Sequence, residues 1–357
     1  MKQIRFLDWP LKRYYGETHV FHRWKNLLRE NGLQVTLHYD HRDTALLDAD
    51  SLIIHSRYFG AWQNTATRNT QNHDELLSFL AGCRAGVNRL IWFDAADSTG
   101  SADLMLLPHV DLFLKKQLLK DKSYYLANTG KPNLRIWLPE SEIANASFTP
   151  ADPAGLDKMR LAWNIGLNDY RYFGYKMSRL SNYLDYTLYP LRFKTVSKDR
   201  PLDVVFRGTI HQGLDAQHGV SEQRNQVLQL LKGIKRNIPV GKITSKRAYW
   251  RELKQARVGI SPFGWGEICY RDFEIMISGC LLIKPDMKHL ETYPNVFIEK
   301  ETYLPVRWDM ADLELQLNTV IEDFPTYLHI AAQGQELYKK ACMDGQGFVN
   351  HFKQTIC

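Results

Sequence analysis

The chain has 357 residues, of which 44% are hydrophobic and 24% charged, a balance that argues against a disordered or membrane-embedded protein. This length exceeds a single core of about 100–200 residues, so we expect two domains. The net charge of +7 suits nucleic acid, an anionic membrane or phosphorylated ligands; because no nucleic-acid motif accompanies the scattered basic residues, a diphosphate ligand or an anionic membrane is favoured.

Targeting and redox signals are sparse. No stretch reaches the roughly 18–20 apolar residues of a spanning helix, and the first residues contain no apolar signal core. We therefore expect a cytoplasmic protein, whose positive charge would allow contact with the inner face of the membrane. The five cysteines never have the C-x-x-C spacing, so we expect reduced thiols rather than disulfides or a zinc site.

The first half alternates strand-like and helix-like segments, the pattern of a parallel sheet covered by helices. We expect strands at residues 4–9, 33–39, 51–55 and 89–93, and helices at residues 20–30 and 74–84. Ligands of such doubly wound sheets collect at the carboxyl ends of the strands. The loops at residues 9–16, 56–60 and 94–100 should therefore line one cleft, which is our candidate acceptor site.

The second half repeats this pattern after residues 187–201, whose prolines and mixed charges are typical of a linker. We expect strands at residues 202–206, 258–261 and 280–284, and helices at residues 221–234 and 273–278. The end of the chain, from residue 331, should be helical with a break at residues 345–347. It would either return across the cleft or form a plain terminal helix.

These patterns predict an α/β fold of two Rossmann-like domains that face a cleft. The predicted divisions are an N-terminal acceptor domain at residues 1–195, a C-terminal donor domain at residues 196–340 and a C-terminal helix at residues 341–357.

The most informative stretch is residues 259–286, GISPFGWGEICYRDFEIMISGCLLIKPD. In this stretch a strand runs into a glycine-rich turn and then into a helix that carries Arg271 and Glu274. Backbone amides at the turn from Gly264 to Gly266 and at the helix start can bind a phosphate, while Glu274 can accept hydrogen bonds from ribose hydroxyls. One loop and one helix would then hold a nucleoside diphosphate.

This stretch resembles the donor motif of GT-B glycosyltransferases, in particular the exostosin-like group and its bacterial relatives. The strand-end Ser-Pro, the arginine before the glutamate and the Glu-to-Gly-Cys run of that group match Ser261, Pro262, Arg271 and residues 274–280. A second segment, DVVFRGT, resembles the turn that opens the donor domain in the same group. The resemblance implies that Arg207, Gly208 and Thr209 lie at the diphosphate, with Arg207 facing it, and that Arg224 adds to that pocket.

The sequence departs from one pattern of these enzymes. Many retaining members carry two glutamates eight positions apart, but Gly266 stands eight residues before Glu274. Glu267 stands seven before it and is expected to touch the sugar. The stereochemical outcome of transfer therefore stays open.

An inverting transfer needs a group that deprotonates the acceptor hydroxyl, and a carboxylate or histidine of the N-terminal cleft is the usual source. Asp94, Asp97, Glu17 and His19 are the candidates. Each carboxylate could instead serve as a helix cap or turn residue. Asp94 and Asp97 could alternatively bind a metal, which we favour less than a role as base.

The resemblance implies transfer of a sugar from a nucleotide-sugar, with a UDP-sugar favoured, to a glycan or lipid-linked glycan, as in polysaccharide biosynthesis. It implies no metal and no cofactor, since arginines and helix amides would hold the leaving diphosphate. Two alternatives stay open: a non-hydrolysing UDP-sugar epimerase, which shares the GT-B plan, and a DNA-glucosylating or other nucleic-acid-binding protein. A periplasmic receptor also has two α/β lobes but would need an export signal.

Overall fold

A computed structural model describes residues 1–9, 16–64, 66–100, 103–126, 149–166, 192–208, 221–234, 236, 238–241 and 245–356. The first part of the chain forms a six-stranded sheet in the order β2-β1-β3-β4-β5-β7, and every neighbouring pair is parallel. Its strands are β1 (Lys2–Leu7), β2 (Leu33–His38), β3 (Ser51–His55), β4 (Leu90–Asp94), β5 (Leu112–Lys115) and β7 (Met159–Leu161).

Helices and short 3₁₀ turns connect these strands. The helices are α1 (Gly16–Arg23), α2 (Lys25–Glu30), α3 (Gly60–Gln63) and α4 (Thr70–Gly86), and the turns are η1 (Thr44–Leu47), η2 (Ser56–Phe59), η3 (Leu104–His109), η4 (Lys122–Tyr125) and η6 (Pro153–Lys158). Asn69 starts α4 with a capping box to Asn72, which satisfies the first free backbone amides. The single helix predicted at residues 20–30 is two helices, with the break at Trp24.

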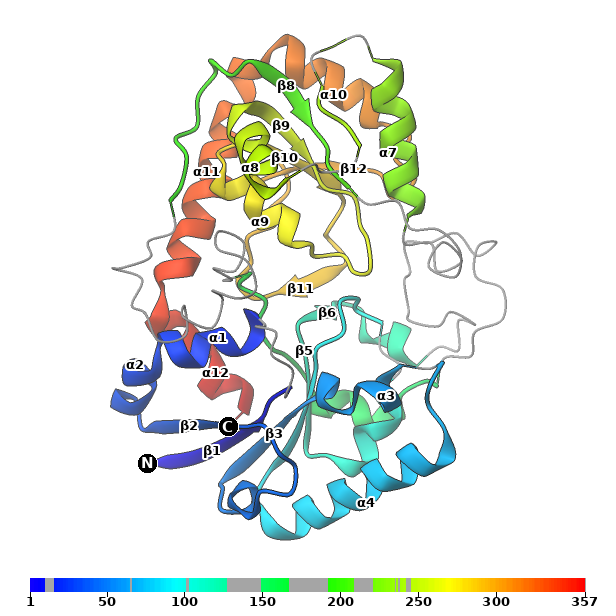
Figure 1. Cartoon of the computed structure of the whole chain (residues 1–357), viewed down its shortest axis with the longest axis vertical. Coiled ribbons are helices and arrows are strands. Elements are labelled where there is room, and N and C mark those ends of the chain that lie inside the picture. Colours follow the sequence, from blue (N-terminus) through cyan, green and yellow to red (C-terminus); the bar gives the residue numbers. More distant parts are fainter. Residues whose placement is uncertain are drawn as a thin grey trace.

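The second part forms a four-stranded parallel sheet in the order β12-β10-β9-β8. Its strands are β8 (Leu202–Val205), β9 (Ala256–Ile260), β10 (Leu281–Pro285) and β12 (Leu304–Val306), and its helices are α7 (Glu222–Gly233), α8 (Lys246–Gln255), α9 (Tyr270–Ile277) and α10 (Leu313–Glu322). This sheet is a second Rossmann-like unit, stacked above the first in Figure 1. The predicted class of two parallel α/β domains that face a cleft, the GT-B arrangement, is confirmed by this topology.

A strand pair and the C-terminal helices join the two domains. Strand β6 (Gln117–Leu119) of the first domain pairs antiparallel with β11 (Leu290–Thr292) of the second. The long helix α11 (Phe324–Met343) then leads down to α12 (Gly345–Ile356), which lies beside α1 and α2 (Figure 1). Phe352 of α12 is fully buried, with its ring 5.2 Å from Phe21 and 5.5 Å from Trp163. The C-terminal helix therefore returns to the N-terminal domain.

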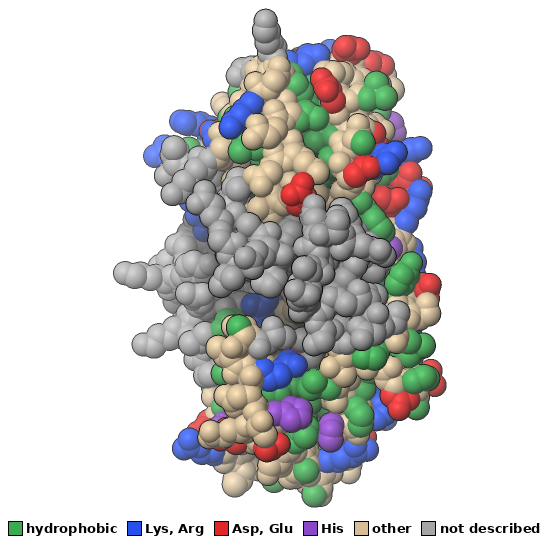
Figure 2. Space-filling model, turned by 90° about the vertical axis from the view of Figure 1, so that its right-hand side faces the viewer, with side chains coloured by type: hydrophobic (Ala, Val, Ile, Leu, Met, Phe, Trp, Pro, Cys, Tyr) green, Lys and Arg blue, Asp and Glu red, His purple; other side chains and the backbone are tan. Residues whose placement is uncertain are grey.

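Charged side chains of both signs cover the outside. Figure 2 shows one face on which the Lys and Arg side chains of the described residues are interspersed with Asp and Glu rather than gathered in one patch. On α8, Arg247 and Arg251 are exposed. Across the described part of the chain, every helix is too short or too polar to span a membrane.

Candidate functional site

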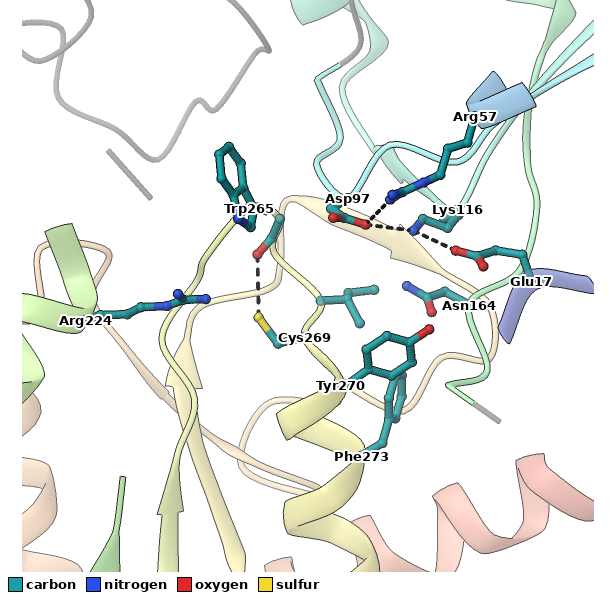
Figure 3. A pocket seen from close by; sticks show the side chains of 12 residues that line it. Glu17, Arg57, Asp97, Lys116, Asn164, Arg224, Trp265, Cys269, Tyr270 and Phe273 are labelled. Atoms are coloured by element: carbon teal, nitrogen blue, oxygen red, sulfur yellow. Dashed lines mark hydrogen bonds and ion pairs between the residues drawn. The ribbon is translucent and has the colours of Figure 1, made fainter. Parts of the chain in front are cut away.

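A cavity of about 300 Å³ lies between the two domains (Figure 3). Side chains that follow strand ends of the first sheet form one wall: Glu17, Arg57, Asp97, Lys116 and Asn164. The glycine-rich turn and the start of α9 form most of the other: Arg224, Trp265, Gly266, Ile268, Cys269, Tyr270 and Phe273. The cavity therefore lies where parallel strands of both sheets end, the usual place for a ligand in this class of fold.

An ion network makes up the N-terminal wall. Lys116 Nζ lies 3.0 Å from Glu17 Oε1 and 3.2 Å from Asp97 Oδ1, and Arg57 Nη2 lies 2.8 Å from the same Asp97 oxygen. Figure 3 shows these four side chains converging from separate elements. Two cations and two carboxylates balance, so the wall offers fixed hydrogen-bonding groups without net charge.

Glu17 keeps a free oxygen in this network. Burial alone would raise the pKa of its carboxyl, but attraction to Lys116, with His55 and Arg57, outweighs burial and lowers the pKa below its usual value. The carboxylate is therefore ionised at neutral pH. Its Oε2 is buried and accepts no hydrogen bond among the described residues. Glu17 can thus receive a hydrogen bond from a substrate hydroxyl, and its low pKa favours this role over that of a strong base.

Two of the four predicted bases do not reach the cavity. Asp94 is 1% exposed, and its Oδ2 lies 2.6 Å from Lys115 Nζ behind the strand ends. His19 is fully buried within α1. The predictions that Asp94 and His19 face the acceptor are wrong, because the covering protein keeps any substrate hydroxyl away from them.

Nor do Asp94 and Asp97 form a metal pair. Asp97 turns into the cavity toward Arg57 and Lys116, whereas Asp94 points to Lys115. In the described ranges, no three His, Cys, Asp or Glu side chains are grouped as metal ligands would be.

The glycine-rich turn of the C-terminal wall is closed by a hydrogen bond from Gly264 N to Gly266 O at 3.1 Å. A methyl group on Gly264 would lie 2.3 Å from Arg224 Nη2, and one on Gly266 would lie 1.6 Å from the Asp97 carbonyl oxygen. A side chain is therefore excluded at Gly266, where the clash is with backbone, whereas at Gly264 the flexible Arg224 side chain would have to move. Ser261 and Pro262 are buried beneath the turn, so they support its shape and do not line the cavity.

Arg224 and Arg271 bring two positive charges to this turn. Arg224 is 8% exposed, and burial, followed by repulsion from Arg271, lowers the pKa of its guanidinium. The Arg271 guanidinium lies over the Phe206 ring at 5.5 Å, and its buried Nη1 has no hydrogen-bond partner in the described part of the chain. Burial and this repulsion both disfavour the charged form of Arg224, and an anion bound beside the two guanidinium groups would offset them.

Arg207 does not extend toward the turn. Its Nε and Nη2 each donate at 2.8 Å to a different oxygen of Glu252, and its Nη1 donates to the Val240 carbonyl. The expectation that Arg207 faces the diphosphate is corrected: the bidentate carboxylate on α8 already holds its planar donors. Gly208 does lie at Arg271, since a methyl group on it would lie 3.6 Å from Arg271 Nη2. Thr209 lies outside the described residues.

Glu274 follows Arg271 by one turn of α9 and is 7% exposed. Its Oε2 accepts a hydrogen bond from the Tyr249 hydroxyl at 2.6 Å, which fixes the carboxylate against α8. Its predicted contact with ribose stays a prediction.

Glu267 is fully buried, and both of its carboxylate oxygens accept hydrogen bonds from Thr99 of the first domain. The expected contact of Glu267 with the sugar is therefore wrong. The side chain reaches the N-terminal domain, where these hydrogen bonds occupy both of its oxygens.

Sequence reasoning missed Lys116, Asn164 and Tyr270 as lining residues, whereas Arg57 belongs to the loop at residues 56–60 that was expected to line the cleft. Lys116 could have been found, because it follows the short apolar run of β5 and thus stands at a strand end.

Asp8, which follows β1 in the N-terminal domain, has a carboxyl whose protonation should make the stability of the fold depend on pH. Burial raises the pKa of its carboxyl to about 7, against hydrogen bonds from Trp9 N and Thr18 Oγ1. The folded chain then holds an extra proton between about pH 4 and pH 7, so its stability falls as pH rises through that window. We expect Asp8→Asn to raise the melting temperature at about pH 8 and to change it little at about pH 4. Equal shifts at both pH values in thermal unfolding would contradict this assignment.

No protein family model matches the chain, and no curated protein matches it in sequence. Among solved structures, an alpha-glucosyltransferase in complex with UDP-glucose and DNA containing an abasic site shares 10% identity over 99% of both chains, with a TM-score of 0.48. The Anabaena protein Alr3699/HepE in complex with UDP-glucose shares 10% identity over 99% of this chain and 100% of its own, with a TM-score of 0.44. The fold described above follows from the strand order of the chain itself.

Proposed function

We propose that this chain is a glycosyltransferase that moves a sugar from a nucleotide-sugar, with a UDP-sugar favoured, to a hydroxyl of a glycan or lipid-linked glycan. One observation carries the proposal: Arg224 lies against the glycine-rich turn before α9, with Arg271 near enough to repel it, and this turn faces a cleft between two Rossmann-like domains. Two arginines and a helix N-terminus together suit a diphosphate. Glu274, one turn further, suits the ribose.

The opposite wall supplies the acceptor side of the reaction. In the proposed step, the acceptor oxygen forms a bond to the anomeric carbon, the bond from that carbon to the diphosphate oxygen breaks, and the nucleoside diphosphate leaves with the bonding electrons. If the reaction inverts, the acceptor proton passes to Asp97, which like Glu17 is a predicted base that lines the cavity; the low pKa of Glu17 suits it to accept a hydrogen bond from the acceptor. Lys116 holds both carboxylates in place.

A binding experiment tests the donor assignment. Isothermal titration of the full chain with UDP, uridine and duplex DNA should show UDP bound at least about 10-fold more tightly than uridine, because the diphosphate meets the two arginines. Failure of the protein to bind UDP or any other nucleoside diphosphate would overturn the proposal. Conversion of a UDP-sugar without acceptor would support an epimerase, and label transferred to DNA would support a DNA-glucosylating enzyme.

Transfer should persist in excess EDTA. Arg224, Arg271 and the backbone amides of α9 are proposed to offset the charge that develops on the leaving diphosphate, so no divalent ion is needed for that task. The measurement is the rate of label transfer from UDP-sugar with and without chelator. Loss of transfer that is restored by added Mg²⁺ or Mn²⁺ would contradict this expectation.

A lipid-linked acceptor would place the protein in the cytoplasm, at the inner face of the membrane. The exposed Arg247 and Arg251 of α8 suit an anionic lipid surface. Sedimentation with vesicles that contain anionic lipid, compared with neutral vesicles, measures this contact.

A further inference from the structure

The phosphate-binding turn is held by the other domain. Glu267, directly after Gly266, sends its side chain into the loop that follows β4. Its Oε2 accepts from Thr99 N at 3.0 Å, and its Oε1 accepts from Thr99 Oγ1 at 2.7 Å and from Ser98 Oγ at 3.3 Å. Gln117 of β6 adds a longer contact of 3.5 Å from Nε2 to Oε2. A fully buried carboxylate thus satisfies donors of three N-terminal residues.

The same loop carries Asp97 of the acceptor wall. The Asp97 carbonyl accepts a hydrogen bond from Gln117 Nε2, and Gly266 packs so closely on this carbonyl that no side chain fits between them. In Figure 3, Asp97 lies directly across from the turn beside Trp265. The backbone that positions a candidate base therefore touches the backbone that would bind phosphate.

Within its own domain, the turn is fixed from below by Lys284 at the end of β10. The Lys284 Nζ donates to the Glu267 carbonyl at 2.7 Å and to Asp272 Oδ2 at 2.9 Å, while Asp272 also accepts from Cys269 N at 2.9 Å. These contacts fix the main chain at Glu267 and at Cys269, two residues further on. The Glu267 side chain, by contrast, makes its hydrogen bonds to Ser98 and Thr99 of the N-terminal loop.

We propose that Glu267 is a positioning residue that docks the phosphate-binding turn of the C-terminal domain on the Asp97 loop of the N-terminal domain, so that the two walls of the site are set as one unit. The proposal rests on the proposed function for the identity of the ligand, but the docking itself does not. A nucleoside diphosphate that orders the turn would also order the loop at residues 94–100, although that loop comes from the other domain.

Glu267→Gln tests this idea in the full chain without ligand. The amide keeps the volume of the side chain but loses the charge, and only one of its two ends can accept, so Thr99 N and the hydroxyls of Thr99 and Ser98 can no longer all donate to it. We expect hydrogen exchange of backbone amides in residues 94–100 and in residues 261–269 to become about 10-fold faster or more. Thr99→Val, which removes only the hydroxyl donor, should give a smaller change in the same two segments.

His351→Phe is the matched control for domain docking elsewhere. It removes the 2.7 Å contact of His351 Nε2 with the Ala162 carbonyl and keeps a ring stacked on Tyr293. Exchange in both loops should stay as in the wild type. If hydrogen exchange in residues 94–100 of Glu267→Gln stays at the wild-type rate, the docking proposal is overturned. This holds whether or not exchange in residues 261–269 becomes faster.

Addition of UDP separates this proposal from the proposed function. In the wild type, UDP should slow exchange in residues 94–100 as well as in residues 261–269, whereas in Glu267→Gln the slowing should be confined to the second segment and UDP should bind about 10-fold more weakly. UDP that protects residues 94–100 equally in both proteins would show that Glu267 does not couple the walls. Failure of the wild type to bind UDP would remove the proposed function, while the ligand-free comparison would still decide the docking.

Discussion

Replacing Arg271 with alanine is expected to weaken binding of UDP by about 100-fold while leaving binding of uridine within about 3-fold of the wild type. The side chain lies over the Phe206 ring, and its buried Nη1 lacks a hydrogen-bond partner among the described residues. Its removal therefore costs the contact with Phe206 but breaks no hydrogen bond of Nη1. Arg271→Lys keeps the charge but loses the planar pair of donors and should recover only part of the affinity. Isothermal titration with both ligands measures the difference.

Arg84→Gln is the control for loss of an ordinary arginine. Arg84 is half-exposed and pairs with Asp111 at 3.2 Å, so its loss should be silent in both titrations, as exposed pairs are worth about 0–1 kcal/mol. Equal losses for UDP and uridine in Arg271→Ala would mean that this residue supports the turn and not the phosphates. The donor assignment would then depend on Arg224 and Glu274.

Strands with long apolar runs could be predicted from the sequence alone. The run SLIIH was expected at residues 51–55 and forms β3 over the same residues, each of them buried. Helix α8 was missed, because KRAYWRELKQ is dominated by charge and only Tyr249, Trp250 and Leu253 are buried. The three-residue strands β7 and β12 are too short to produce a pattern and exist because neighbouring strands pair with them.

Local motifs identified the turn, but distant partners decided which charged side chains remain accessible. Gly264, Gly266 and Arg271 come together within one short stretch, so their grouping could be read directly. Asp94 also stands at a strand end, yet parallel pairing sets it beside Lys115 and neutralises it.

Arg207 shows the same limit, since Glu252, 45 residues away, takes its donors. Such pairings depend on register and on helix placement, which a residue pattern does not contain. The ion network on the cavity wall is the converse case: Lys116 was not singled out from the sequence, but the strand order brings it between Glu17 and Asp97.

Glu274→Ala is expected to lower transfer by 10-fold or more, since the loss of ribose hydrogen bonds costs about 1.4 kcal/mol for each factor of ten. The structure adds a complication, because the same substitution leaves the Tyr249 hydroxyl without its acceptor at 2.6 Å. Tyr249→Phe isolates that loss: it removes the hydroxyl, keeps the carboxylate, and should lower the melting temperature more than the affinity for nucleotide.

Glu274→Gln completes the comparison, because its amide oxygen can still accept from Tyr249 while the charge is lost. If Glu274 binds ribose, both Glu274 variants should weaken binding of uridine and of UDP by similar factors, since the two ligands share the ribose. This result would be the opposite of the one expected for Arg271, where the diphosphate alone senses the change. Wild-type affinity for uridine in Glu274→Ala, with a melting temperature as low as that of Tyr249→Phe, would show that the carboxylate serves only to hold α8 against α9.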